Sequence, residues 1–280
     1  MSDNWVVNNL INAFNTWNEK LSEIWTLIST TPQDFKGGTI WGLIVNINGA
    51  LQAIAYGLLI LFFAMSVCKS TASFRELRHP EQALRFFIRF AGAKAAITYG
   101  MDIMNAIFTI CGGVVSQIAA GMGGMTAAVT MPPEMQSAIE SLGFFESIPL
   151  WLITLLGSLF ITVLSFIMIL TVYARFFKLY MYTAISPVAM ATFGGDTTSS
   201  TGKAFIKGYI AVCMEGAIII LACLIYSAFA GSGSVALGGA SPDTITMVWA
   251  YIAEVIFSML VLVGLVKGAD RIVKEMLALG

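Results

Sequence analysis

The sequence predicts an all-α, polytopic membrane protein with about five transmembrane helices. Hydrophobic residues make up 58% of the 280-residue chain, charged residues make up only 11%, and the mean hydropathy is +0.83. A helix needs about 20 apolar residues to cross a bilayer, and runs of that length recur between short polar or glycine-rich stretches. The sequence lacks the alternating pattern of a membrane barrel, so we expect every span to be helical.

Residues 4–29 have the pattern of an amphipathic helix. Apolar residues recur in steps of three and four, which gathers them on one face, and polar residues fill much of the other side. Two placements fit this pattern equally well: packing on the helical bundle or a partner, or lying in the membrane interface. We expect residues 1–40 to form an extracytoplasmic region and residues 41–280 to form the transmembrane domain.

The predicted spans are residues 41–68, 90–120, 149–174, 204–230 and 244–266. A basic connector, residues 69–89, follows the first span, and the positive-inside rule places it in the cytoplasm. Pro80 is expected to begin a second helix within it. The basic residues of the connector are Lys69, Arg75, Arg78, Arg85 and Arg89.

The connector 121–148 holds no basic residue, which predicts that it lies outside. Within it, the stretch 139–145 is expected to form a short helix. The connector after the fourth span also lacks basic residues and is expected outside.

The apolar run 179–195 decides the topology, because it is short for a crossing and contains Pro187. Basic pairs flank it on both sides, at Arg175 and Lys178 and at Lys203 and Lys207. The positive-inside rule therefore places both flanks in the cytoplasm. We expect a re-entrant or in-plane helix broken near Pro187, with the N-terminus outside and the C-terminus in the cytoplasm. The alternative is six spans with one basic cluster misplaced.

Irregular backbone at membrane depth is tolerated where it is buried in protein or lines a wet cavity. This makes the run 179–195 our candidate gate or contact for cytoplasmic partners. Its candidate residues are Pro187, Phe193, Gly194 and Gly195.

Three acids, Asp102, Glu215 and Glu254, lie near the centres of predicted spans, and Lys94 lies in the same span as Asp102. Each costs at least ~2.5–3.5 kcal/mol at the bilayer centre, so it should face a partner or water. They could line an ion pathway, or they could hold helices or subunits together through hydrogen bonds. We favour the second interpretation, with Lys94 as a possible partner for one of the acids.

The sequence does not predict an enzyme, a cofactor or a metal site. The loop from Gly195 to Ala204 resembles a phosphate-binding loop, but its spacing is wrong and alanine replaces the hydroxyl that holds magnesium. His79 has no neighbouring metal ligand, and the cysteines are expected to act as buried apolar residues. The cysteines are Cys68, Cys111, Cys213 and Cys223.

The segment from Phe176 to Ile220 resembles the TrbL-type polytopic membrane subunit of type IV secretion and conjugation systems. The shared features are the apolar helix from Lys178 to Ile185, Pro187 followed by small and aromatic residues, Thr201, and Phe205 with Gly208-Tyr209. Tyr209 stands where many relatives have tryptophan. The predicted topology is also similar to that of this family.

The resemblance implies a channel or scaffold subunit in the cell membrane that forms homo-oligomers. It also implies contact with single-stranded DNA carrying its relaxase, and partner ATPases that drive the transfer. The alternatives are a small-solute transporter or permease subunit, and a structural anchor for a soluble complex. The basic connector 69–89 could bind anionic lipid head groups or nucleic acid, although positive-inside topology accounts for most of its charge.

Overall fold

The computed structural model describes residues 4–72, 80–120, 129–231 and 244–279, and these residues contain helices and no strands. Its helices confirm the predicted all-α class. Two short 3-10 helices, η1 (Phe35–Gly38) and η2 (Thr192–Gly194), accompany the α-helices. The α-helices are α1 (Trp5–Ser29), α2 (Thr39–Ala72), α3 (Pro80–Thr98), α4 (Gly100–Ala120), α5 (Pro133–Glu140), α6 (Phe144–Ala191), α7 (Ser199–Gly231) and α8 (Thr244–Met276).

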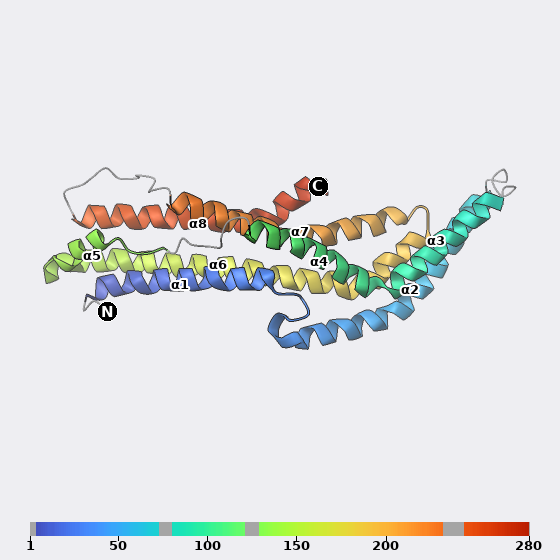
Figure 1. Cartoon of the computed structure of the whole chain (residues 1–280), viewed down its shortest axis with the longest axis horizontal. Coiled ribbons are helices and arrows are strands. Elements are labelled where there is room, and N and C mark those ends of the chain that lie inside the picture. The colour runs from blue at the N-terminus through green and yellow to red at the C-terminus, as the bar shows by residue number, and fades with distance from the viewer. Residues whose placement is uncertain (1–3, 73–79, 121–128, 232–243, 280) are drawn as a thin grey trace. The chain divides into compact units, whose positions relative to one another are not determined.

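The chain forms two compact units that do not follow the predicted division at residue 40. The first unit combines residues 1–29, 116–173 and 218–269, and the second combines residues 30–115, 174–217 and 270–280. α1 therefore belongs with later helices and is not a separate region. The two units are described separately below (Figure 1).

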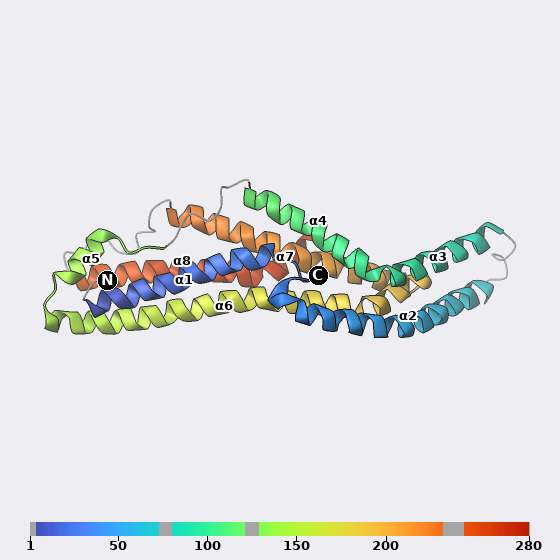
Figure 2. The same cartoon turned by 60° about the horizontal axis from the view of Figure 1, so that its bottom comes forward.

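In the first unit, α1 packs along the N-terminal part of α6 (Figures 1 and 2). The Asn4 side chain caps α1 by accepting a hydrogen bond from Val6 N at 3.0 Å. Trp5 lies 5.3 Å from Trp151 between ring centroids, and at the other end the Tyr173 hydroxyl donates to Glu23 at 3.3 Å. The two helices are thus parallel and run side by side over most of the length of α1.

The apolar face of α1 is buried in this bundle. Phe14 meets Tyr251 of α8 and Trp17 meets Tyr226 of α7, both in edge-on aromatic contacts. Every apolar side chain of the buried face is at most 3% exposed. Packing on the bundle is therefore the correct alternative for the amphipathic helix. The buried face consists of Val6, Val7, Leu10, Ala13, Phe14, Trp17, Leu21, Ile24 and Ile28.

In the second unit, α2 and α3 form an antiparallel pair. Phe63 and Phe90 lie 4.9 Å apart between ring centroids, and the Tyr56 and Thr98 hydroxyls hydrogen-bond at 2.9 Å. The turn before α2 is anchored by Phe35, whose ring stacks on Phe176 of α6 at 4.0 Å. Pro80 begins α3, as predicted.

Within the described residues, five helices are long and apolar enough to cross a membrane: residues 35–69, 100–120, 147–194, 199–228 and 245–276. The number agrees with the prediction, but two boundaries differ. The predicted span 90–120 is divided between α3 and α4 at Tyr99. Helical hydrogen bonds of 2.9 Å, from Tyr99 N to Ala95 O and from Ile103 N to Tyr99 O, continue across this point, so the chain bends there without a loop.

The larger difference concerns the run 179–195, which is not a separate helix. The predicted third span and most of this run form the single helix α6, which has 48 residues and continues through Pro187 to Ala191. At 1.5 Å per residue this helix is about 72 Å long, more than twice the hydrocarbon thickness of a bilayer. The short helix expected near 139–145 also forms, but earlier, as α5.

Candidate functional site

α6 passes through Pro187 because a neighbouring helix replaces the missing hydrogen bond. Proline has no backbone N–H, so the carbonyl of Thr183, four residues earlier, loses its helical partner. The buried Asn48 side chain of α2 donates to this carbonyl at 2.7 Å, and the Ser186 hydroxyl donates to it at 2.9 Å. Asn48 also donates to Ser186 Oγ at 3.0 Å. The helix α6 therefore continues through Pro187, and the carbonyl that the proline frees is hydrogen-bonded to Asn48 of α2.

The turn after α6 lies against α2 and α3. A Cβ atom at Gly194 would clash with Leu59 Cδ1, and one at Gly195 would lie 3.2 Å from the Phe62 carbonyl oxygen, so both glycines allow a close approach to α2. The Ser66 hydroxyl donates to Asp196 at 3.0 Å, and Arg89 of α3 forms an ion pair with the same carboxylate. The candidate gate is thus held on two helices.

A buried arginine lies between α6 and α7 in the second unit. Arg175 is 1% exposed, and its guanidinium donates to the carbonyls of Val212 at 3.2 Å and Cys213 at 3.1 Å. It also lies 5.9 Å from the ring centroid of Phe108, in the range of a cation–π contact. Gly216 leaves room for the guanidinium, because a Cβ there would lie 2.8 Å from Arg175 Cζ.

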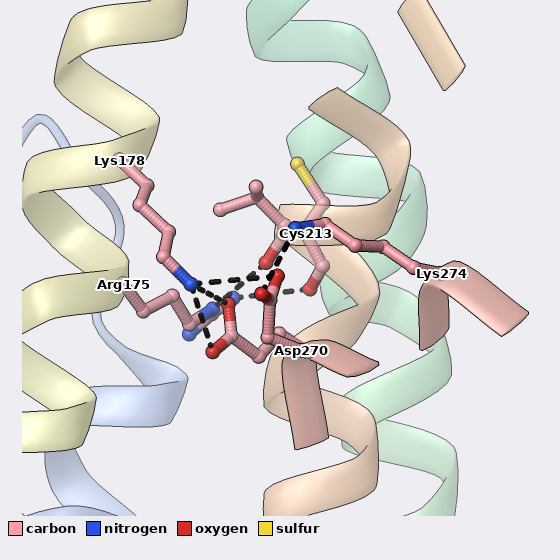
Figure 3. A network of polar contacts seen from close by, with 7 residues as sticks. Arg175, Lys178, Cys213, Asp270 and Lys274 are labelled. Carbon is pink, nitrogen blue, oxygen red and sulfur yellow. Dashed lines mark hydrogen bonds and ion pairs between the residues drawn. The ribbon is translucent and has the colours of Figure 1, made fainter. Parts of the chain in front are cut away.

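One turn along α6, Lys178 joins α7 and α8 through two carboxylates (Figure 3). Its ammonium lies 3.4 Å from Glu215 Oε2 and 3.4 Å from Asp270 Oδ1. Asp270 also pairs with Lys274 at 3.0 Å. Glu215 is 2% exposed, so Lys178 compensates a buried negative charge. We call Arg175, Lys178, Glu215, Asp270 and Lys274 the polar cluster.

The polar cluster can hold three helices in register, but it does not resemble a catalytic centre. Each carboxylate faces an ammonium from another helix or from the next turn, and the guanidinium donates from Nε and Nη2 to two backbone carbonyls and lies near an aromatic ring. Over the described ranges, no group of three or more histidine, cysteine or acidic side chains could hold a metal ion. The ion pairs and hydrogen bonds of the cluster therefore connect helices.

The structure brings Glu215, but not the other predicted polar residues, into the cluster. Lys94 and Asp102 are exposed on α3 and α4, and Glu254 is half-buried on α8. The partner of Glu215 is Lys178, not Lys94. Three of the cysteines are buried as expected, whereas Cys68 is exposed.

The basic connector is described in part. Lys69 and Arg85 are exposed near the end of α2 and the start of α3, and Arg89 is paired with Asp196. Arg75 and Arg78 lie outside the described residues.

Sequence reasoning missed the polar cluster because it used Arg175 and Lys178 only to assign topology. Asp270 was overlooked as part of a charged C-terminal end. The spacing of Asp270 and Lys274, four residues apart on one helix face, was a readable signal for their pairing. No sequence pattern indicated that α6, α7 and α8 would bring these charges together.

Comparison with known proteins places the chain in a family of membrane proteins. The family model of TrbL/VirB6 plasmid conjugal transfer like proteins matches residues 17–187, more than half of the chain. The matched range ends at Pro187 and leaves out Phe193, Thr201 and Tyr209, so it rests largely on other residues than the resemblance in the sequence. No curated protein matches the chain. The chain therefore belongs to the TrbL/VirB6 plasmid conjugal transfer-like family, as a multi-pass membrane component of a conjugal transfer, or type IV secretion, system.

Proposed function

We propose that the protein is a channel or scaffold subunit that helps move a DNA–protein substrate across the cell membrane. It works as a homo-oligomer beside other transfer subunits, and partner ATPases supply the energy. The substrate is single-stranded DNA with its relaxase, and the protein contributes no catalytic step of its own. The N-terminus lies outside and the C-terminus in the cytoplasm.

The observation that carries this proposal is the closed polar cluster. Its two carboxylates are paired with ammonium groups across α6, α7 and α8, and Glu215 is almost fully buried while paired to Lys178. Breaking a buried pair of this kind costs about 3–5 kcal/mol, so the three helices are held in one arrangement. A fixed arrangement of apolar helices suits the wall or frame of a large channel.

The buried Glu215 also favours one competing function, a small-solute transporter. An acid at membrane depth is a common element of ion-coupled transport. In this chain both oxygens of Glu215 face Lys178, at 3.4 and 3.5 Å, which leaves the carboxylate engaged within the protein. A transporter would need this pair to open in each cycle.

A gene deletion in a conjugation donor tests the proposal. We expect DNA transfer to be abolished and to return with the wild-type gene, while growth and solute uptake stay unchanged. Normal transfer in the deletion strain would refute the proposal. Ion-coupled solute flux in vesicles containing the purified protein alone would support the transporter.

A further inference from the structure

The first unit has two unlike surfaces, and the first is a polar stripe on α1. We call the side chains of Asn12, Asn15, Glu19, Ser22, Thr26 and Ser29 the α1 stripe. They are exposed and recur in steps of three and four, so they form one line along the helix opposite its buried face. Each of them is polar.

The second surface lies on the adjacent part of α6 and is entirely apolar. Every exposed side chain between residues 152 and 170 is aliphatic or aromatic, and Phe160 and Leu170 are 58% and 63% exposed. Contact with water is unfavourable for this apolar surface, whereas contact with lipid tails is favourable. The exposed residues are Leu152, Leu155, Leu156, Leu159, Phe160, Val163, Phe166 and Leu170.

The two surfaces overlap along the unit: Asn12, Asn15 and Glu19 lie alongside the apolar part of α6, whereas Ser22, Thr26 and Ser29 lie beside its end. α1 begins beside Trp151 and comes beside Tyr173 near its end, so it accompanies α6 over the predicted third span. Its 25 residues extend over about 37 Å, enough for the ~30 Å hydrocarbon core. If residues 149–174 cross the bilayer, the N-terminal part of the α1 stripe, Asn12, Asn15 and Glu19, lies at membrane depth.

Polar side chains at membrane depth require water or a polar partner. We propose that the α1 stripe lines a water-filled passage formed by several copies of this chain, with α6 of each copy facing lipid. One helix cannot surround a passage, but copies arranged around a closed symmetry axis can. This inference rests on the proposed channel function and assigns its lining to α1.

The chemistry of the stripe indicates what the passage would carry. Amides and hydroxyls dominate, Glu19 is its one charged member, and Lys20 beside it is paired with Glu23 at 2.7 Å. Proteins that hold single-stranded DNA use a positively charged groove and aromatic platforms, and the stripe has neither. Such a lining lets a hydrated polyanion or polypeptide slide without being bound.

The inference also revises the placement of residues 1–40. α1 would start outside and end inside, which conflicts with the predicted extracytoplasmic position of its C-terminal end. Lys36 would then lie on the cytoplasmic side, in keeping with the positive-inside rule. Because the basic connector 69–89 is also placed in the cytoplasm, α2 would then not cross the bilayer.

Cysteine accessibility in donor membranes tests the inference. In a Cys68→Ser background, Asn12→Cys, Asn15→Cys and Ser22→Cys probe the stripe, and Leu156→Cys and Phe160→Cys probe α6. Ala13→Cys, on the buried face of α1, is the matched control on the same helix. We expect an impermeant maleimide to label the stripe cysteines at least about tenfold faster than the α6 cysteines and Ala13→Cys. The reason is that only a hydrated thiol forms the reactive thiolate.

Transfer assays on the same strains separate this inference from the proposed function. A bulky maleimide on Asn15→Cys should abolish transfer, whereas the same reagent on Ser137→Cys of α5 should not. Slow labelling of both stripe and α6 would mean that a partner covers the stripe, and equal fast labelling would mean that α6 is not in lipid. Either result overturns the passage, while the deletion strain independently decides whether the protein serves transfer.

Discussion

Asn48 shows how a single side chain can decide the course of a long helix. It donates to the Thr183 carbonyl that Pro187 leaves without a partner, inside a pair of apolar helices. Sequence reasoning expected Pro187 to break the helix, because the proline is visible locally and its remedy lies 139 positions earlier in the chain. Only the tertiary structure brings the donor to the carbonyl.

We expect Asn48→Leu to destabilise the protein by about 1–3 kcal/mol, since a buried acceptor loses its strongest donor. The loss should shrink in a Pro187→Ala background, because alanine restores the backbone N–H for Thr183. The melting temperature of the four purified proteins in detergent measures this coupling. Asn46→Leu, at an exposed position of the same helix, is the control. Equal losses in both backgrounds would disprove the role of Asn48.

Gly216 is the second residue whose role can be measured. Gly216→Ala places a methyl group against the Arg175 guanidinium, and overpacking of this kind costs about 1–3 kcal/mol. The cost should largely disappear in an Arg175→Met background, where the planar group is gone. Gly264→Ala is the control, since nothing lies within 4 Å of its added Cβ. A stable Gly216→Ala protein with Arg175 present would contradict the described contact.

At the scale of elements, periodicity and composition predicted most of the fold. The steps of three and four in α1, the apolar runs of α2, α7 and α8, and the start of α3 at Pro80 are all present in the structure. Two boundaries were not predictable. The bend at Tyr99 lies next to Gly100, a glycine among several in these spans, and the continuity of α6 depends on Asn48. The ends of helices thus depended on neighbours that the sequence alone does not reveal.

Packing on α6 leads to a prediction about membrane sidedness. Phe35 stacks on Phe176, and two residues further along α6 Asp270 pairs with Lys178, all within the second unit. Segments so close together cannot lie on opposite sides of a bilayer. We therefore expect Lys36→Cys and Arg271→Cys, both at exposed positions, to be labelled from the cytoplasm.

An impermeant maleimide applied to intact cells and to inverted membranes measures this. Glu140→Cys at the end of α5 serves as the control and should be labelled from outside, because its connector has no basic residue. Labelling of Lys36→Cys from outside, with Arg271→Cys labelled from inside, would refute the packing of both segments on α6.

For the whole molecule, the family could be recognised from the sequence, but the candidate site could not. The resemblance rested on Pro187 and its surroundings, and the family match extends from residue 17 to 187. Of the residues in the polar cluster, Glu215 was predicted as an intramembrane contact. Its partners come from helices far apart in the sequence, so no spacing rule could join them.

We infer that the polar cluster holds α6, α7 and α8 in the arrangement that DNA transfer requires. Lys178→Met leaves the buried Glu215 without its cation, which should cost about 3 kcal/mol because Lys178 is itself partly exposed. Adding Glu215→Gln removes the uncompensated charge and should restore much of that loss. Asp270 keeps Lys274 in both variants.

The most direct measurement is the frequency of DNA transfer from the deletion strain complemented with wild type, Lys178→Met, or Lys178→Met with Glu215→Gln, at equal protein levels in the membrane. We predict that the single variant transfers poorly and that the double variant recovers toward wild type. If the double variant transfers no better than the single one, or if Lys178→Met transfers normally, DNA transfer does not depend on the ion pair between Lys178 and Glu215.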